Sequence, residues 1–229
     1  MSKKVKVILL ILVFIIGLGL FLYPAITSRI NRTHLKREVE HFEEELNEIK
    51  ESHDLDHLYE LMKAYNAQLY EERQIHLNSE EAYEIPCMDL TVYGFENNMV
   101  GSLYIERIDL TVPILLGASN ENMFEGVTHL SNTSLPIGGI NTNCVISGHR
   151  GMVSKEMFRN IEEIQIGDLI QITNFWETLT YEVKEVEVVE VTQTEKLFIQ
   201  EGKDMVTLIT CHPYQVFNQR YMVYCERVK

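Results

Sequence analysis

The sequence predicts a mainly β protein: a closed or nearly closed β-barrel with short helices, preceded by a transmembrane helix and an amphipathic helical region. The barrel is predicted because short stretches rich in Val, Ile, Leu, Thr and Tyr recur after about residue 86, with turn signals between them. The helices are predicted because an uninterrupted apolar run and two stretches with helical spacing come before that point. A chain of 229 residues is long enough for one folded domain and its extensions.

The first element is an apolar run over residues 7–26, about the length that crosses a bilayer as a helix. A cleaved signal peptide is the alternative, but the run exceeds the usual apolar region of about 7–15 residues and "AIT" is a poor cleavage site. Basic residues lie on both sides of the run, so the positive-inside rule does not decide its orientation. They are Lys3, Lys4 and Lys6 before it and Arg29, Arg32, Lys36 and Arg37 after it.

Residues 27–85 form the predicted helical region. Two sets of apolar residues recur at spacings of three and four, with "ESHD" between them, which predicts two amphipathic helices joined by a turn. The sets are Leu35, Val39, Phe42, Leu46 and Ile49, then Leu55, Leu58, Met62, Tyr65 and Leu69. Asp54 is a suitable N-cap for the second helix.

Residues 86–229 form the predicted barrel. The strand candidates are "GSLYIERI", "LTVPILL", "NCVISGH", "GDLIQIT", "LTYEVKEVEVVEV", "MVTLITC" and "RYMVYCERV". "SNENMFEGV" and "TEKLFIQEG" are predicted as short helical insertions. Pro113 cannot donate a ladder hydrogen bond and therefore indicates an edge or a bulge in its strand.

Composition limits the function. The 34 Asp and Glu outnumber the 20 Lys and Arg, giving a formal charge of −14, and no basic stripe with interleaved aromatics occurs, so nucleic acid is not an expected partner. The cysteines show no CxxC pair and no Cys/His ligand spacing, so no metal site is expected. They are Cys87, Cys144, Cys211 and Cys225.

The stretch "MVTLITCHPY" ends a strand candidate on Cys211, where a thiol can project into a cleft. A nucleophilic thiol needs a histidine within hydrogen-bond reach. His212 is adjacent but should point to the other face of the strand. His149 in "CVISGHRG" is the better candidate, since Gly148 and Gly151 allow close backbone approach. Arg220 in "NQRYMV" can stabilise an oxyanion or hold the substrate backbone. Taken singly, each of the three is more simply a structural residue.

Together these residues resemble the sortase family. "TLITC" matches its cysteine signature, "SGHRG" resembles its histidine segment, and Arg220 completes the order His, Cys, Arg. "GVTHLSNTSLPIGGINTNCVISGHRG" and "EGKDMVTLITCHPY" resemble the pilus-building class C sortases in particular. The resemblance implies that His149, Cys211 and Arg220 are catalytic and that Thr210 helps to shape the oxyanion site. His129 recurs in these relatives, and we expect it to be a structural histidine.

The sequence departs from class C in two respects. The Asp-Pro-aromatic lid motif of that class is absent, although residues 83–89 offer another cover. Many class C members also carry a second, C-terminal transmembrane helix, whereas this sequence ends at Lys229, directly after its last strand candidate. With no lid motif, we expect the Cys211 thiol to be open to solvent.

The resemblance implies a transpeptidase at the plasma membrane. Cys211 would cleave an LPxTG-like sorting signal of a surface or pilin protein and form a thioacyl intermediate, without metal or organic cofactor. The acceptor would be a lysine of a pilin subunit or, in a housekeeping sortase, the amine of a cell-wall precursor. Both are extracellular, which places residues 1–6 in the cytoplasm and the barrel outside, after one membrane pass. An inactive scaffold that binds sorting signals, a plain cysteine peptidase and a disulfide among Cys87, Cys144 and Cys225 remain open.

Overall fold

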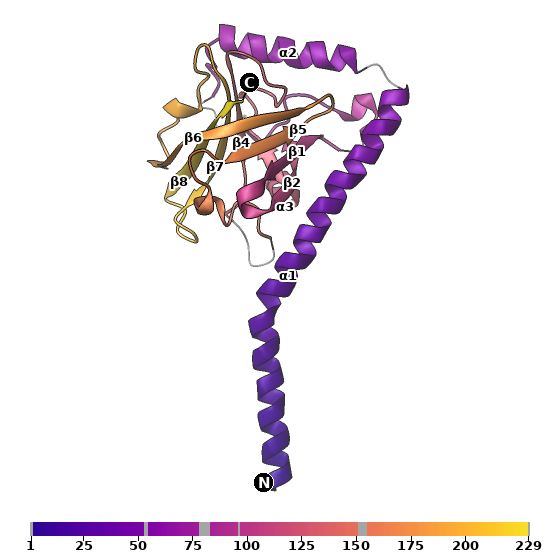
Figure 1. The fold of residues 1–229 in the computed structure, drawn as a ribbon, viewed down its shortest axis with the longest axis vertical. Coiled ribbons are helices and arrows are strands. Elements are labelled where there is room, and N and C mark those ends of the chain that lie inside the picture. The colour runs from indigo at the N-terminus through magenta and orange to yellow at the C-terminus, as the bar shows by residue number, and fades with distance from the viewer. Residues whose placement is uncertain (1, 53–54, 78–82, 96, 151–154, 229) are drawn as a thin grey trace.

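The computed structural model describes residues 2–52, 55–77, 83–95, 97–150 and 155–228. Within them, eight strands close into a barrel in the order β1-β2-β3-β4-β7-β8-β6-β5, and β5 pairs with β1 (Figure 1). The strands are Met99–Ile105 (β1), Leu110–Leu116 (β2), Val127–His129 (β3), Thr142–Ser147 (β4), Leu169–Thr173 (β5), Thr178–Glu190 (β6), Asp204–His212 (β7) and Gln219–Arg227 (β8). The predicted closed barrel is confirmed.

Two neighbouring pairs in the barrel are parallel: β2 with β3, and β4 with β7. The other neighbouring pairs are antiparallel. A parallel pair needs a crossover connection, and the chain between β4 and β7 supplies it with β5 and β6. Because β4 and β7 run in the same direction, their carboxyl ends meet at one edge of the barrel.

Helix α1, Lys3–Ser52, joins the predicted apolar helix and the first amphipathic helix without a break. Residues 27–34 contain neither glycine nor proline, so nothing in that stretch ends the helix. The axis of α1 bends partway along (Figure 1), and Pro24 inside the helix, which lacks an N–H and crowds the preceding turn, accounts for a bend of this kind.

The two halves of α1 differ in burial. Side chains over residues 7–26 are exposed, with Phe14 at 70% and Leu20 at 71%, and by length and composition the helix can cross a membrane. In the second half, the predicted apolar face is buried and packs beside β1 and β2. Its members are Leu35, Val39, Phe42, Leu46 and Ile49.

Helix α2, Asp56–Glu71, is the second predicted amphipathic helix. Leu55 occupies its N-cap position without a side-chain cap, and the predicted cap Asp54 lies outside the described residues. Buried Asn66 attaches the helix to the barrel: its Nδ2 donates to the Leu135 carbonyl at 3.3 Å, and its Oδ1 accepts from the Leu135 N–H at 2.7 Å. α2 therefore holds the chain that leads from β3 to β4.

The smaller elements follow the predictions closely. Asn120–Glu125 forms α3, and Ser119 caps it by accepting a hydrogen bond from the N–H of Asn122. Glu195–Leu197 is one turn of 3-10 helix, as are Thr91–Tyr93, Glu106–Ile108 and Ile161–Glu163. Pro113 pairs with Ser102 of β1 and directly precedes Ile114, where pairing with β3 begins, so its missing N–H interrupts no β2–β3 bond. Short β3 was not predicted from the sequence.

Candidate active site

Strands β7 and β8 place the predicted thiol and guanidinium together. Cys211 lies directly opposite Arg220 in the antiparallel ladder. Directly opposed side chains point to the same face of a sheet, with Cβ atoms about 5 Å apart. Nη1 of Arg220 donates to the carbonyls of Phe217 at 3.2 Å and Gln219 at 3.0 Å, which holds the guanidinium over the start of β8.

His149 reaches the same place through β4. The parallel ladder pairs Ser147 with Ile209, and the N–H of Gly148 donates to the Ile209 carbonyl at 3.2 Å. Continuing this register by two residues places His149 beside Cys211. Cys211 and Arg220 are thus paired on β7 and β8, and His149 follows the end of the adjacent strand β4, two residues after the Ser147–Ile209 pair. We call these three residues the row.

The face that carries this row is the outer face of the barrel wall. Val206 and Leu208 belong to the cluster inside the barrel, whereas Ile209 belongs to a second apolar cluster. Because side chains alternate along a strand, Cys211 lies on the Ile209 face. Cys211 and His149 are each partly exposed, so a substrate can reach them from solvent.

Gly148 is required by the packing beneath His149. A Cβ at this position would lie 2.7 Å from the ring of buried Phe158 and 3.0 Å from a methyl group of Val127. The tight contact lets the chain turn from β4 into the histidine loop, as the sequence predicts for this glycine. Gly151, the second predicted glycine, lies outside the described residues.

Thr210 is anchored inside the barrel wall. Its side chain is 2% exposed, and its hydroxyl donates to the Gly148 carbonyl at 2.6 Å. The hydroxyl lies on the face opposite to Cys211. Its bond links β7 to the residue before His149, so this geometry supports a positioning role; the predicted part of Thr210 in an oxyanion site stays a prediction.

A polar cluster lies behind the row, on the other side of β7. Buried Arg150 donates from Nη1 to Nδ1 of His212 at 2.7 Å, and its Nη2 lies 2.5 Å from Oε2 of Glu162. Nδ1 of His212 also lies 3.1 Å from Oε1 of Glu162. Nη1 of Arg150 also contacts the Cys211 carbonyl at 3.4 Å. His212 thus points away from the thiol, as predicted, and Arg150 ties the backbone of Cys211 to the histidine loop.

Arg150 and Glu162 were not singled out from the sequence. Arg150 stands next to His149 in "SGHRG", so its position was a usable signal. Glu162 lies twelve residues further on, in a single turn of 3-10 helix, and only folding brings it against Arg150.

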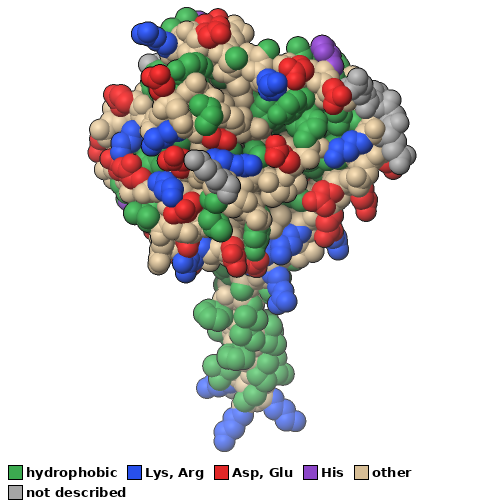
Figure 2. Space-filling model, turned by 45° about the horizontal axis from the view of Figure 1, so that its top comes forward, with side chains coloured by type: hydrophobic (Ala, Val, Ile, Leu, Met, Phe, Trp, Pro, Cys, Tyr) green, Lys and Arg blue, Asp and Glu red, His purple; other side chains and the backbone are tan. Residues whose placement is uncertain are grey.

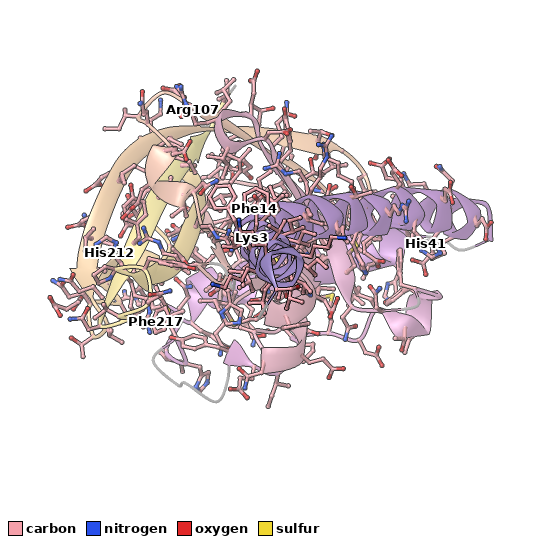
Figure 3. All side chains as sticks on the ribbon, turned by 90° about the horizontal axis from the view of Figure 1, so that it is seen from below. Lys3, Phe14, His41, Arg107, His212 and Phe217 are labelled. Carbon is pink, nitrogen blue, oxygen red and sulfur yellow. The ribbon has the colours of Figure 1, made fainter. Side chains whose placement is uncertain are left out.

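Figure 3 looks along α1 from its N-terminal end. In this view His212 and Phe217 lie on the same side of the helix axis.

The apolar surface next to Cys211 is covered by residues that precede the barrel. Leu77 is fully buried in a cluster with Val145, Ile209 and Met222 on the outer face of β4, β7 and β8, and Tyr83 packs against that cluster. Gln74 is 3% exposed, and its side chain connects the chain segments on the two sides of this apolar surface. Its Nε2 donates to the Asn132 carbonyl at 3.1 Å, and its Oε1 accepts from the Ile199 N–H at 2.6 Å.

We call Gln74, Leu77 and Tyr83 the strap. Cys211 is partly exposed, and the strap covers the apolar surface around Ile209, two residues away along β7. The described part of the alternative cover, residues 83–89, is fixed in part beside β2 and β3. The Ala118 N–H donates to the Tyr83 carbonyl at 2.7 Å, and the Ser131 hydroxyl donates to the Ile85 carbonyl.

The other thiols are placed unlike Cys211. Cys144 and Cys225 are buried, and burial raises the pKa of both. Burial also raises the pKa of Cys87 to about 11, although a hydrogen bond with Tyr65 opposes the shift. A raised pKa lowers the thiolate fraction near neutral pH. The four thiols are free in this structure, so no disulfide joins them.

The histidines differ in environment too. Burial lowers the pKa of His149 below the ordinary value of histidine, so the ring is mainly neutral at neutral pH and can accept a proton from a thiol. His129 is fully buried, and its Nε2 lies 3.1 Å from the carbonyls of Thr133 and Ser134. These contacts fit the structural role predicted for it. Among the described residues, no group of three His, Cys, Asp or Glu side chains could hold a metal ion.

Comparison with known proteins gives a consistent family. A family model described as a Sortase domain matches residues 103–228, which contain the whole row. The chain is 30% identical over 131 residues to Sortase D of Bacillus subtilis (strain 168) and 26% identical over 129 residues to Sortase A of Bacillus anthracis. Each match covers 56% of this chain, with 63% and 59% of the relatives, so the chain spans less than two thirds of these curated proteins.

Solved structures match over a larger part of the chain. Sortase C-1 from Streptococcus pneumoniae is 30% identical with a TM-score of 0.73, covering 84% of this chain and 98% of that one. Sortase C from Clostridium perfringens, solved with the C-terminal cell wall sorting motif, is 28% identical with a TM-score of 0.70 over 84% and 98%. Sortase C1 of GBS Pilus Island 1 is 30% identical with a TM-score of 0.69 over 88% and 92%.

Proposed function

The chain belongs to the sortase family, and from this premise we propose that it is a membrane-anchored cysteine transpeptidase acting on LPxTG-like sorting signals. The observation that carries the proposal is the pairing of Cys211 with Arg220 on β7 and β8, with His149 following the end of the adjacent strand β4. Acyl transfer through a thioester requires a nucleophile, a proton carrier and a cation near one another, and these three residues can supply them.

The chemistry assigns one role to each member of the row. His149 takes the proton of the Cys211 thiol, and the thiolate attacks the carbonyl carbon of the threonine in the sorting signal. The Arg220 guanidinium stabilises the negative charge that develops on the carbonyl oxygen, or holds the peptide backbone. His149 returns its proton to the departing glycine amine, and the Thr-Gly bond breaks. A thioacyl enzyme is left, and no metal or cofactor is needed.

An amine completes the reaction by attacking the thioester carbon: the C–S bond breaks, His149 takes a proton from the amine, and that proton returns to the sulfur of Cys211. We propose that the amine is a lysine of a pilin subunit. Support comes from the class C resemblance of the sequence and from a structural relative that belongs to a pilus island. A cell-wall precursor amine is the second candidate, since the sequence lacks the class C lid motif and the matched curated proteins are Sortases D and A.

We further propose that residues 7–26 of α1 anchor the protein in the plasma membrane by a single pass. These side chains are exposed and apolar, which is costly in water and favourable in a bilayer. Figure 2 shows the apolar stalk between basic side chains at its free end and basic side chains where it meets the head. Sorting signals and acceptors are extracellular, so residues 1–6 remain inside, and residues 27–85 and 86–229 form the external helical and catalytic parts.

Mass spectrometry of the full-length protein with an LPxTG peptide and candidate amines tests the activity. We expect a thioacyl adduct on Cys211 and an amide product with the preferred amine. Cys211→Ala should form neither, while Cys87→Ala, Cys144→Ala and Cys225→Ala should keep most turnover. His149→Ala and Arg220→Ala should each lower kcat/KM by about 10² or more. Arg220→Lys should fail as well, since an ammonium lacks the planar pair of donors.

The reaction products distinguish the candidate functions. Transfer to a pilin lysine supports polymerisation, and transfer to a cell-wall amine supports the housekeeping role. Acid product at a rate independent of added amine would identify a peptidase. Peptide binding without an adduct would identify a scaffold, and full turnover by Cys211→Ala would overturn the mechanism.

A further inference from the structure

Arg150 is a buried charged residue that the proposed reaction does not use. Its side chain is 4% exposed, and a guanidinium at that depth is stable only where other groups replace its hydration. Its Nη2 lies 2.5 Å from Oε2 of Glu162, and its Nη1 lies 2.7 Å from Nδ1 of His212 and 3.4 Å from the Cys211 carbonyl oxygen. Arg150 therefore contacts the backbone of the nucleophile directly.

The backbone on both sides of His149 is bonded to β7 at the level of Cys211. On one side, the Thr210 hydroxyl donates to the Gly148 carbonyl at 2.6 Å. On the other side, Arg150 directly follows His149, and its guanidinium contacts the Cys211 carbonyl. These two contacts fix the chain that carries His149 relative to the chain that carries the thiol.

Glu162 determines the direction of the Arg150 side chain. Its Oε2 contacts the guanidinium, and its Oε1 lies 3.1 Å from Nδ1 of His212. It projects from a single turn of 3-10 helix whose first residue, Ile161, is fully buried, so the turn is anchored in the core. Without this carboxylate, the buried guanidinium loses the partner that compensates its charge, and we expect it to turn towards water. The contact with the Cys211 carbonyl is then lost as well.

We propose that Arg150 and Glu162 are positioning residues for acyl transfer. The proposal rests on the transpeptidase activity proposed above. Arg150 holds the backbone of Cys211 to that of His149, and Glu162 holds Arg150. Proton transfer between a thiol and an imidazole requires the two groups to lie within hydrogen-bond reach. A looser backbone therefore lowers the rate of acylation and leaves the binding of the peptide unchanged.

Single-turnover acylation of the full-length protein by an LPxTG peptide separates rate from binding. Quenched samples analysed by mass spectrometry give the maximal rate of thioacyl formation and the peptide concentration at half of that rate. Glu162→Ala should lower the maximal rate about tenfold and change the half-saturating concentration by less than about twofold, because lost positioning acts on the transition state. Glu162→Gln, which keeps one acceptor oxygen, should lie between that variant and wild type. The matched control Glu163→Ala removes an exposed carboxylate from the same turn and should acylate at the wild-type rate.

Arg150→Gln should lower the maximal rate by about 10². The double variant, Arg150→Gln with Glu162→Ala, should be no slower than Arg150→Gln alone, since the two residues act as one unit. Urea unfolding followed by Trp176 fluorescence reports whether each variant is folded. The Glu162 side chain is 48% exposed, so Glu162→Ala tests the proposal even if Arg150→Gln does not fold.

Three results would overturn the proposal: an unchanged maximal rate in Glu162→Ala, equal losses in Glu162→Ala and Glu163→Ala, or a loss that lies in the half-saturating concentration instead of the rate. Failure of the proposed function gives a different result. Wild type that forms no thioacyl adduct contradicts the transpeptidase activity and the positioning role with it. Active wild type with an unaffected Glu162→Ala variant contradicts the positioning role alone.

Discussion

Single buried residues hold the loops around the candidate site, and His129 is the clearest case. It lies at the end of β3, fully buried, with Nε2 against the carbonyls of Thr133 and Ser134. A ring nitrogen facing two carbonyls carries the proton and donates, so the neutral tautomer fits this site. Burial lowers the pKa of His129 to about 4, because the charged ring would lose its hydration.

This shift makes stability depend on pH. The unfolded chain binds a proton at His129 below about pH 6.5, while the folded protein resists protonation down to about pH 4. The free energy of unfolding should therefore fall as the pH falls through this window, by about 2 kcal/mol between pH 7 and pH 5 from this group. Urea unfolding in detergent micelles, followed by Trp176 fluorescence, measures the slope. His129→Asn should flatten it and the exposed-site variant His76→Asn should not; equal slopes in wild type and His129→Asn would contradict the assignment.

At the scale of elements, Leu77 and Tyr83 of the strap pack with residues of β4, β7 and β8 next to the candidate site. Gln74 bonds to the chain on both sides of the surface, through the Asn132 carbonyl and the Ile199 N–H. Leu77 fills the apolar cluster that includes Ile209, on the same face as Cys211. The strap therefore covers the surface along which a peptide would approach the thiol from the Ile209 side.

Weakening the strap should expose the thiol. We expect Leu77→Ala and Gln74→Ala to raise the rate at which a small thiol reagent alkylates Cys211 in the full-length protein, by about tenfold, which corresponds to about 1.4 kcal/mol. Ile75→Ala is the matched control, because Ile75 is 69% exposed in the same segment. Peptide mapping by mass spectrometry reports the rate at Cys211 alone. Unchanged rates in both strap variants would show that the strap does not limit access.

At the scale of the whole molecule, α1 serves two environments. Its first half is exposed and apolar, and its second half belongs to the core of the barrel domain. Phe42 on α1 packs on Phe95 and Phe175, with ring centroids 6.0 and 5.7 Å apart, and Phe175 continues to Trp176 at 5.3 Å. This aromatic chain ties the helix to the turn between β5 and β6.

The two halves should respond differently to the same substitution. Phe42→Ala removes a ring that is 4% exposed and should lower the free energy of unfolding of the barrel by about 3–5 kcal/mol. Phe14→Ala lies in the exposed half and should leave that value unchanged. Trp176 fluorescence during urea unfolding in micelles reports both. Equal stability of the two variants would mean that α1 does not contribute to the core.

Much of this protein follows from its sequence because the signals are local. Alternating apolar strands, helical spacing from Leu35 to Ile49 and the long apolar run each reflect burial along a single segment, and the structure places those segments as predicted. The order of His149, Cys211 and Arg220 along the chain is likewise predicted from the sequence, because each residue is recognised from the short stretch around it.

The tertiary structure alone decided the rest, because it depends on contacts between distant segments. The parallel pairing of β4 with β7 brings the end of β4, which leads into His149, beside the strand that carries Cys211, and neither strand encodes its partner. The Thr210 hydroxyl turned out to bond Gly148 inside the wall, because its face is set by register. The bond of Gln74 to Ile199 joins residues far apart in the chain, and the salt bridge of Arg150 with Glu162 joins two separate short segments. Such long-range pairings arise from packing of the whole chain, where no short stretch carries enough information to specify its partner.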